Sequence, residues 1–272
     1  MKFNIRMRPR RLGLSLAGLA VIGVVALPVA GGSAGASTHS GETIVLEHGA
    51  WADGSSWDGV VARLQRDGYS VDVTPNPLRG PSFDSAYLAS YLKTLTGPIV
   101  LVGHSYGGFV ISDAATGNKN VKALVYVDAY IPSRGETINA INQRFPGSQL
   151  VPNALSFVPS AGGVVDVYLK ANDFRTILAN DLPATQAAEL AATQRPIAAS
   201  ALEQPSGIPA WPTIPSWDVI GTQDHAIPVA AQEFMARRAH ARVTEISASH
   251  LSMISQPRDV ATVIEEAARS VQ

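Results

Sequence analysis

The chain has 272 residues, of which 46% are hydrophobic, with 21 basic and 22 acidic residues and no cysteine. Without cysteine, the sequence excludes disulfides, metal-thiolate sites and a thiol nucleophile. The absence of a basic run beyond the N-terminus argues against nucleic acid as a partner. The length is sufficient for one domain with a large core.

Residues 1–36 have the pattern of a secretory signal peptide. Five basic residues and no acidic ones lie in this segment, and an apolar run covers residues 12–29. Ala34-Gly35-Ala36 follows as an A-x-A cleavage site. We therefore predict that this segment is removed during export.

The predicted mature protein starts at Ser37, with Ala30 as a second possible cleavage point. Residues 37–272 then form a single secreted domain with 16 basic and 22 acidic residues, a formal charge of −6. Two alternatives remain open. Arg10-Arg11 could mark twin-arginine export, and an uncleaved apolar run would be a membrane anchor.

Along the mature chain, short buried-strand patterns alternate with amphipathic helical patterns. The expected strands cover residues 43–47, 70–73, 98–102, 121–127, 217–220 and 242–246. The expected helices cover residues 56–67, with Ser56 as the N-cap, and residues 83–94, 109–116, 229–238 and 257–271. This alternation predicts an α/β fold with a mostly parallel sheet and helices on both faces.

Residues 132–215 interrupt the alternation. They are rich in Pro, Ala, Asn and Gln, show no convincing buried strand, and have helical patterns near 164–179 and 185–193. The apolar side chains among them argue against a floppy surface excursion. We expect a helical cap over the strand ends, where open α/β sheets bind ligands.

Ser105 is the predicted nucleophile. It is the centre of Gly103-His104-Ser105-Tyr106-Gly107, which lies between a strand pattern and a helical pattern. A strained turn of this kind lifts a serine above the end of the sheet, and glycines allow strand and helix to pass closely. Residues 31–35 also match G-x-S-x-G, but no helical pattern follows them.

A serine hydroxyl needs a base, and the base needs an orienting carboxylate. In this architecture they follow later strands in the order Ser, Asp, His. Asp224 and His250 occupy those positions after residues 217–220 and 242–246. Asp128 is the main rival for the acid, and His225 is interpreted as a loop residue.

The developing oxyanion needs donors, which we assign to the backbone N–H groups of Tyr106 and Ala50. Ala50 lies in the loop after the first strand, where Gly49 permits close approach of the backbone. Trp51 and Trp211 are candidates for lining the substrate pocket, although either could belong to the core.

Together, the segments 48–51 and 103–108 with Asp224 and His250 resemble the methyl-salicylate esterase and hydroxynitrile lyase branch of the α/β-hydrolases and its bacterial esterase relatives. In that branch the lyases carry a threonine after the loop histidine and a lysine after the catalytic histidine. Here those positions are Gly49 and Leu251. The resemblance therefore implies the esterase pattern.

We expect a secreted serine carboxylesterase that needs no cofactor or metal and cleaves small to medium hydrophobic esters through an acyl-enzyme. The same residues would also suit a lactonase, an amidase or a perhydrolase. A non-catalytic small-molecule-binding homologue is a further alternative. The expected partner is a small-molecule ester, without nucleic acid, and with a membrane only if the N-terminal segment is retained.

Overall fold

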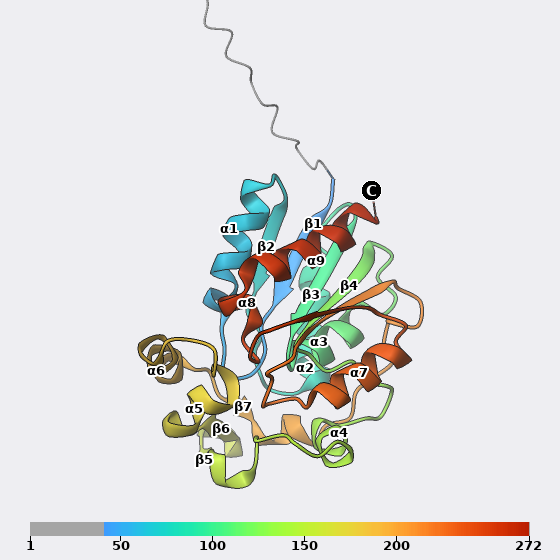
Figure 1. The fold of residues 1–272 in the computed structure, drawn as a ribbon. Coiled ribbons are helices and arrows are strands. Elements are labelled where there is room, and N and C mark those ends of the chain that lie inside the picture. Colours follow the sequence, from blue (N-terminus) through green and yellow to red (C-terminus); the bar gives the residue numbers. More distant parts are fainter. Residues whose placement is uncertain (1–40, 272) are drawn as a thin grey trace, which may run out of the picture. The chain divides into compact units, whose positions relative to one another are not determined.

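The computed structural model describes residues 41–271, in which six strands form one parallel sheet in the order β2-β1-β3-β4-β8-β9 (Figure 1). The strands are β1 (Thr43–Glu47), β2 (Ser70–Thr74), β3 (Ile99–His104), β4 (Val121–Val127), β8 (Ser216–Gly221) and β9 (Arg242–Ile246). The expected parallel α/β sheet is confirmed, and all five of its strand pairs are parallel.

Burial follows the place of each strand in the sheet. Every residue of β3 and β8 is buried, because helices cover both faces of the sheet centre. The edge strands β2 and β9 are partly exposed and contain more polar residues. The continuous apolar runs in the central strands are what made them recognisable in the sequence.

Helices α1 (Asp58–Arg66), α8 (Ser252–Ser255) and α9 (Pro257–Arg269) pack together, and α9 lies against β3, β4 and β8. Helices α2 (Pro81–Leu92) and α3 (Gly107–Ala114) pack together on the opposite face, and α7 (Val229–Arg238) packs against β8 (Figure 1). The sheet is thus covered on both faces, as the alternation predicted.

The first helix begins differently from the sequence prediction. A 3₁₀ turn, Gly54–Trp57, precedes α1, and the N-cap of that turn is Asp53. The Asp53 carboxylate accepts a hydrogen bond from the Ser55 N–H at 2.8 Å. Ser56 is therefore not the cap, because the carboxylate three residues earlier already satisfies the free N–H group.

Between β4 and β8 the chain forms a cap that is not only helical. It contains α4 (Ile138–Arg144), α5 (Ala171–Leu178), α6 (Ala184–Thr193) and an antiparallel sheet of β5 (Leu155–Pro159), β6 (Val165–Leu169) and β7 (Ile197–Ala198). Three 3₁₀ turns complete it: Pro152–Ala154, Ala161–Gly163 and Ala199–Leu202.

The expected helix near residues 164–179 is wrong in its first part. β6 buries Val167 and Leu169 and turns Asp166 and Tyr168 to the other face, which is the period of a strand. The helix begins only at Ala171. The prediction near residues 185–193 agrees with α6.

Within residues 41–271 no helix is both long enough and apolar enough to cross a bilayer. The predicted signal peptide, its cleavage sites and the domain start at Ser37 lie outside the described residues. They remain predictions from the sequence.

Candidate active site

Ser105 lies on a strained turn between β3 and α3. Its φ is 53°, in the left-handed region that non-glycine residues rarely adopt. A Cβ on Gly103 would lie 2.7 Å from the Gly107 carbonyl oxygen, and one on Gly107 would lie 2.8 Å from that of Glu47. Glycine is needed at both positions because helix and strand approach this closely.

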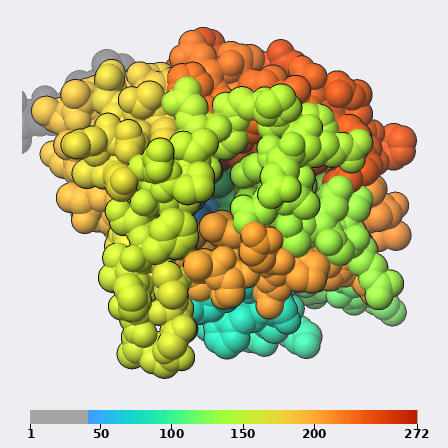
Figure 2. All heavy atoms as spheres, turned by 90° about the horizontal axis from the view of Figure 1, so that it is seen from below, coloured from blue at the N-terminus to red at the C-terminus, as the bar shows by residue number. Residues whose placement is uncertain are grey.

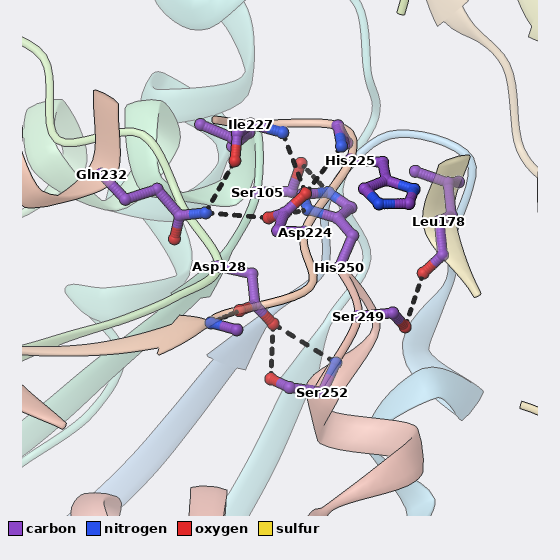
Figure 3. Close-up of polar contacts among 12 residues, drawn as sticks. Ser105, Asp128, Leu178, Asp224, His225, Ile227, Gln232, Ser249, His250 and Ser252 are labelled. Atoms are coloured by element: carbon purple, nitrogen blue, oxygen red, sulfur yellow. Dashed lines mark hydrogen bonds and ion pairs between the residues drawn. The ribbon is translucent and has the colours of Figure 1, made fainter. Parts of the chain in front are cut away.

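The Ser105 hydroxyl lies 2.9 Å from Nε2 of His250, and Nδ1 of His250 lies 2.8 Å from Oδ2 of Asp224 (Figure 3). A carboxylate only accepts hydrogen bonds, so the proton of the neutral ring is on Nδ1. Nε2 is then free to accept the Ser105 O–H proton. The three side chains that the sequence singled out form one hydrogen-bonded chain.

Asp224 is held by four donors. Its Oδ1 accepts from the N–H groups of Ala226 and Ile227 at 2.7 and 2.9 Å. Its Oδ2 accepts from Gln232 Nε2 at 2.9 Å as well as from His250 (Figure 3). These contacts fix the carboxylate in the orientation that the imidazole requires.

The surroundings of His250 favour its protonated form. Burial alone would lower the pKa of His250, but the charge of Asp224, their hydrogen bond and the charge of Asp128 raise it above its usual value of 6.5. This balance suits a base that must hold a proton part-way through a reaction.

The backbone around His250 is fixed from two sides. The His250 carbonyl accepts from Nε2 of His104 at 2.9 Å, and burial lowers the pKa of His104 so that its ring stays neutral. From the cap, the Leu178 carbonyl accepts from the Leu251 N–H at 3.1 Å, and the Asp181 carboxylate accepts from the Ser249 N–H at 3.0 Å and from the Ser249 hydroxyl. The Ser249 Oγ also lies 3.0 Å from the Leu178 carbonyl oxygen (Figure 3).

The rival residues are placed elsewhere. Asp128 accepts from the N–H groups of Gly221 and Ser252 at 2.7 and 3.3 Å and also from the Ser252 hydroxyl. Burial and the nearby charge of Asp224 raise the pKa of its carboxyl. It braces the start of the Asp224 loop and the end of the His250 loop without contacting the imidazole of His250. The Nδ1 of His225 instead lies 2.8 Å from the Thr176 carbonyl oxygen.

The loop after β1 lies directly beside the serine. A Cβ on Gly49 would lie 2.7 Å from the Ser105 Cβ, so only glycine fits there. The Ala50 and Tyr106 N–H groups, which the sequence predicted as oxyanion donors, donate to no other group within residues 41–271. Both residues line the cavity at Ser105.

That cavity has a volume of about 50 Å³ and lies between the core and the cap. Figure 2 looks at the cap side and shows the hollow, with the blue of the early chain at its bottom. Apart from the serine, its lining is mostly apolar: Ala50, Trp51, Tyr106, Tyr130, Ile138, Asn139, Asn142, Leu150, Leu155, Ile197 and Leu202. A larger groove of about 490 Å³ between α2 and residues 113–120 is lined by none of these.

The two candidate tryptophans have different positions. Trp51 lines the cavity and donates from its indole N–H to the Val167 carbonyl of β6 at 2.9 Å. Trp211 does not line the cavity. Its indole donates to the Pro132 carbonyl at 2.7 Å, and the guanidinium of Arg238 lies 6.0 Å from its ring. Trp211 packs against the core, which is the alternative that the sequence left open.

Sequence reasoning missed the residues that support the site. Gln232 lies eight residues after Asp224 on the first turn of α7, a spacing that could have suggested contact. Nothing in the sequence indicates that Asp181 and Leu178 of the cap would hold Ser249 and Leu251. Within the described chain no three His, Asp or Glu side chains converge into a possible metal site.

A model of the alpha/beta hydrolase family matches residues 44–263. A carbendazim hydrolyzing esterase from a Nocardioides species is 29% identical over 153 residues, which are 52% of this chain and 60% of that relative. A pyrethroid hydrolase from Sphingobium wenxiniae is 26% identical over 251 residues, or 82% of this chain and 86% of the relative. The crystal structure of polyneuridine aldehyde esterase shares the fold, with a TM-score of 0.72, 18% identity, and coverage of 83% of this chain and 98% of that one.

Proposed function

Because the chain belongs to the alpha/beta hydrolase family, we propose that it is a secreted serine carboxylesterase with Ser105 as nucleophile, His250 as base and Asp224 as orienting acid. One observation carries the proposal. The hydrogen-bonded chain of these three side chains ends at a serine beside two unused backbone N–H groups. That arrangement supplies every group that acyl transfer to serine requires.

In the first half of the reaction, Ser105 Oγ attacks the ester carbonyl carbon while its proton passes to Nε2 of His250. The carbonyl oxygen becomes an oxyanion beside the N–H groups of Ala50 and Tyr106. The carbon–oxygen bond to the alcohol then breaks, and His250 returns the proton to the leaving alcohol. The acyl group remains on Ser105.

In the second half, water attacks the acyl carbon and gives a proton to His250. The bond to Ser105 breaks, the serine recovers the proton, and the carboxylic acid leaves. Asp224 orients the imidazole and stabilises the imidazolium that forms in both halves. The buried position of these groups strengthens that attraction because water screens it little.

The apolar lining favours small to medium hydrophobic esters over charged ones. The names of the two curated relatives, a carbendazim hydrolyzing esterase and a pyrethroid hydrolase, agree with this class. A cavity of about 50 Å³ is smaller than such substrates. We therefore expect the cap segments around it to move outward when an ester binds.

The test is Ser105→Ala, assayed on chromogenic esters of increasing acyl length and on several lactones. We expect hydrolysis to fall by several powers of ten and labelling by a fluorescent organophosphonate to disappear, while the melting temperature stays near wild type. Ser90→Ala is the control, because Ser90 is exposed on α2. Retained labelling of the Ser105→Ala protein would contradict the assignment, and a wild type without turnover would favour a binding protein.

Export is tested separately by N-terminal sequencing of the protein from culture medium. The signal pattern predicts a start near Ser37. A full-length product that sediments with membranes would support the anchor instead.

A further inference from the structure

The peptide unit that carries the Ala50 N–H is held on its opposite side by the ring of His48. Nδ1 of His48 lies 2.9 Å from the Gly49 carbonyl oxygen, which belongs to that same peptide unit. Nε2 of His48 accepts from the Asn76 N–H at 3.1 Å. His48 is fully buried and lies at the end of β1, beside the serine turn.

These two contacts determine the tautomer of His48. A backbone N–H only donates, so Nε2 must accept and carries no proton. The single proton of the neutral ring is therefore on Nδ1, which donates to the Gly49 carbonyl. Burial lowers the pKa of His48 to about 4, so the ring stays neutral throughout the range of an ester assay.

The direction of the Ala50 N–H follows from the planarity of the peptide. In a trans peptide the C=O and N–H bonds point in opposite directions. A hydrogen bond that draws the Gly49 oxygen toward His48 therefore turns the Ala50 N–H the other way. Ala50 lines the cavity at Ser105, and its N–H has no acceptor within the described chain.

Asn76 holds His48 in place by a second contact. Its side-chain Nδ2 donates to the His48 carbonyl at 2.8 Å, and its Oδ1 accepts from the Leu78 N–H at 3.3 Å. Asn76 is fully buried in the loop between β2 and α2. Backbone and side chain of one asparagine thus clamp both the ring and the main chain of His48.

We propose that His48 and Asn76 are positioning residues that aim the Ala50 N–H at the oxyanion of the reacting ester. This inference rests on the proposed function, because only acyl transfer at Ser105 develops that charge. Neither residue touches the substrate. They act through the Gly49–Ala50 peptide, whose carbonyl oxygen is bonded to the ring of His48.

Three substitutions of His48 distinguish the contribution of the Nδ1 hydrogen bond from that of the Nε2 hydrogen bond. In His48→Asn the amide nitrogen takes the place of Nδ1 and can still donate to Gly49. In His48→Gln the amide reaches the place of Nε2 and can still accept from Asn76. His48→Phe keeps a planar aromatic ring of somewhat larger volume and removes both contacts.

We expect kcat on a short aryl ester to fall by about 10- to 100-fold in His48→Phe and His48→Gln, with KM unchanged, because loss of one oxyanion donor costs about 10²–10³-fold in kcat. His48→Asn should restore kcat to within about threefold of wild type. Asn76→Ala should also lower kcat and leave KM unchanged. Melting temperatures identify any variant that is merely unfolded.

A measurement on the wild-type protein does not depend on any variant folding. Long-range ¹H–¹⁵N NMR at pH 7 should show His48 as the Nδ1–H tautomer. An Nε2–H tautomer overturns the inference, as does wild-type kcat in a folded His48→Phe or an equal loss in His48→Asn and His48→Phe. If the wild type hydrolyses no ester, the proposed function fails instead, and the tautomer still reports on the geometry.

Discussion

Glu47, at the end of β1, is a buried carboxyl group that should make the stability of this protein depend on pH. Burial, opposed by a hydrogen bond with Thr74 and assisted by the charge of Asp84, raises its pKa from 4.5 to about 8. Only 1% of the residue is exposed, so solvent does not screen the effect. Thr74 Oγ1 also lies 3.2 Å from the Leu46 carbonyl, and a protonated Glu47 allows Thr74 to donate there.

The sign follows from the order in which the two states lose the proton. The unfolded chain releases it near pH 4.5 and the folded protein only near pH 8, so unfolding becomes more favourable as the pH rises between these values. At about 1.4 kcal/mol per pKa unit the total is about 5 kcal/mol, of which about 4 kcal/mol falls between pH 5 and pH 9.

Glu47→Gln removes this titration while keeping the size of the side chain. Urea unfolding at pH 5, 7 and 9, followed by tryptophan fluorescence, gives the free energy of unfolding of each protein. The free energy of unfolding of the variant minus that of the wild type should increase by about 4 kcal/mol from pH 5 to pH 9. The exposed Glu266 provides the control through Glu266→Gln. A difference that does not change with pH would refute the reasoning.

Three further predictions concern the site. Asp224→Asn and His250→Ala should each lower kcat by three or more powers of ten, whereas Asp128→Asn should keep activity and change mainly the melting temperature. If Asp128→Asn were the inactive variant and Asp224→Asn were active, the orienting acid would be the residue that follows β4. Because the pKa of His250 is raised above 6.5 and the base acts when neutral, kcat/KM should fall with decreasing pH around a midpoint above 6.5. A midpoint at 5 in a pH series would contradict this. Gly49 has no hydroxyl and Leu251 no cation for departing cyanide, so mandelonitrile should release none above the uncatalysed rate, measured by a cyanide electrode.

The sequence predicted the sheet well because its central strands are buried on both faces. Residues 43–47 and 121–127 were assigned with the bounds that the structure shows. Ser105, Asp224 and His250 were identifiable because each lies in the turn or loop that follows a strand, and the carboxyl ends of parallel strands lie at one edge. For these three residues the local sequence pattern was sufficient to predict where they lie in the fold.

The cap was predicted poorly because its strands are short and stabilised by distant partners. Val165, Val167 and Leu169 alternate with polar residues, but five residues cannot distinguish a strand from the start of a helix. Asp166 is paired with Arg79 at 2.7 Å, a contact 87 residues away in the chain. The place of Trp211 was left open for a related reason, since its size indicates burial but not the neighbours it will have.

The hydrogen bonds that Asp181 and Leu178 of the cap accept from the two neighbours of His250 limit how the cap of this protein could be exchanged. A cap that only covered a pocket could be exchanged for that of a relative. The exchange would change the substrate specificity and leave the reaction rate at the site nearly unaffected. Here the last turn of α5 also shapes the loop that carries the base. A transplanted cap should therefore preserve activity only if the segment 247–252 is taken from the same donor.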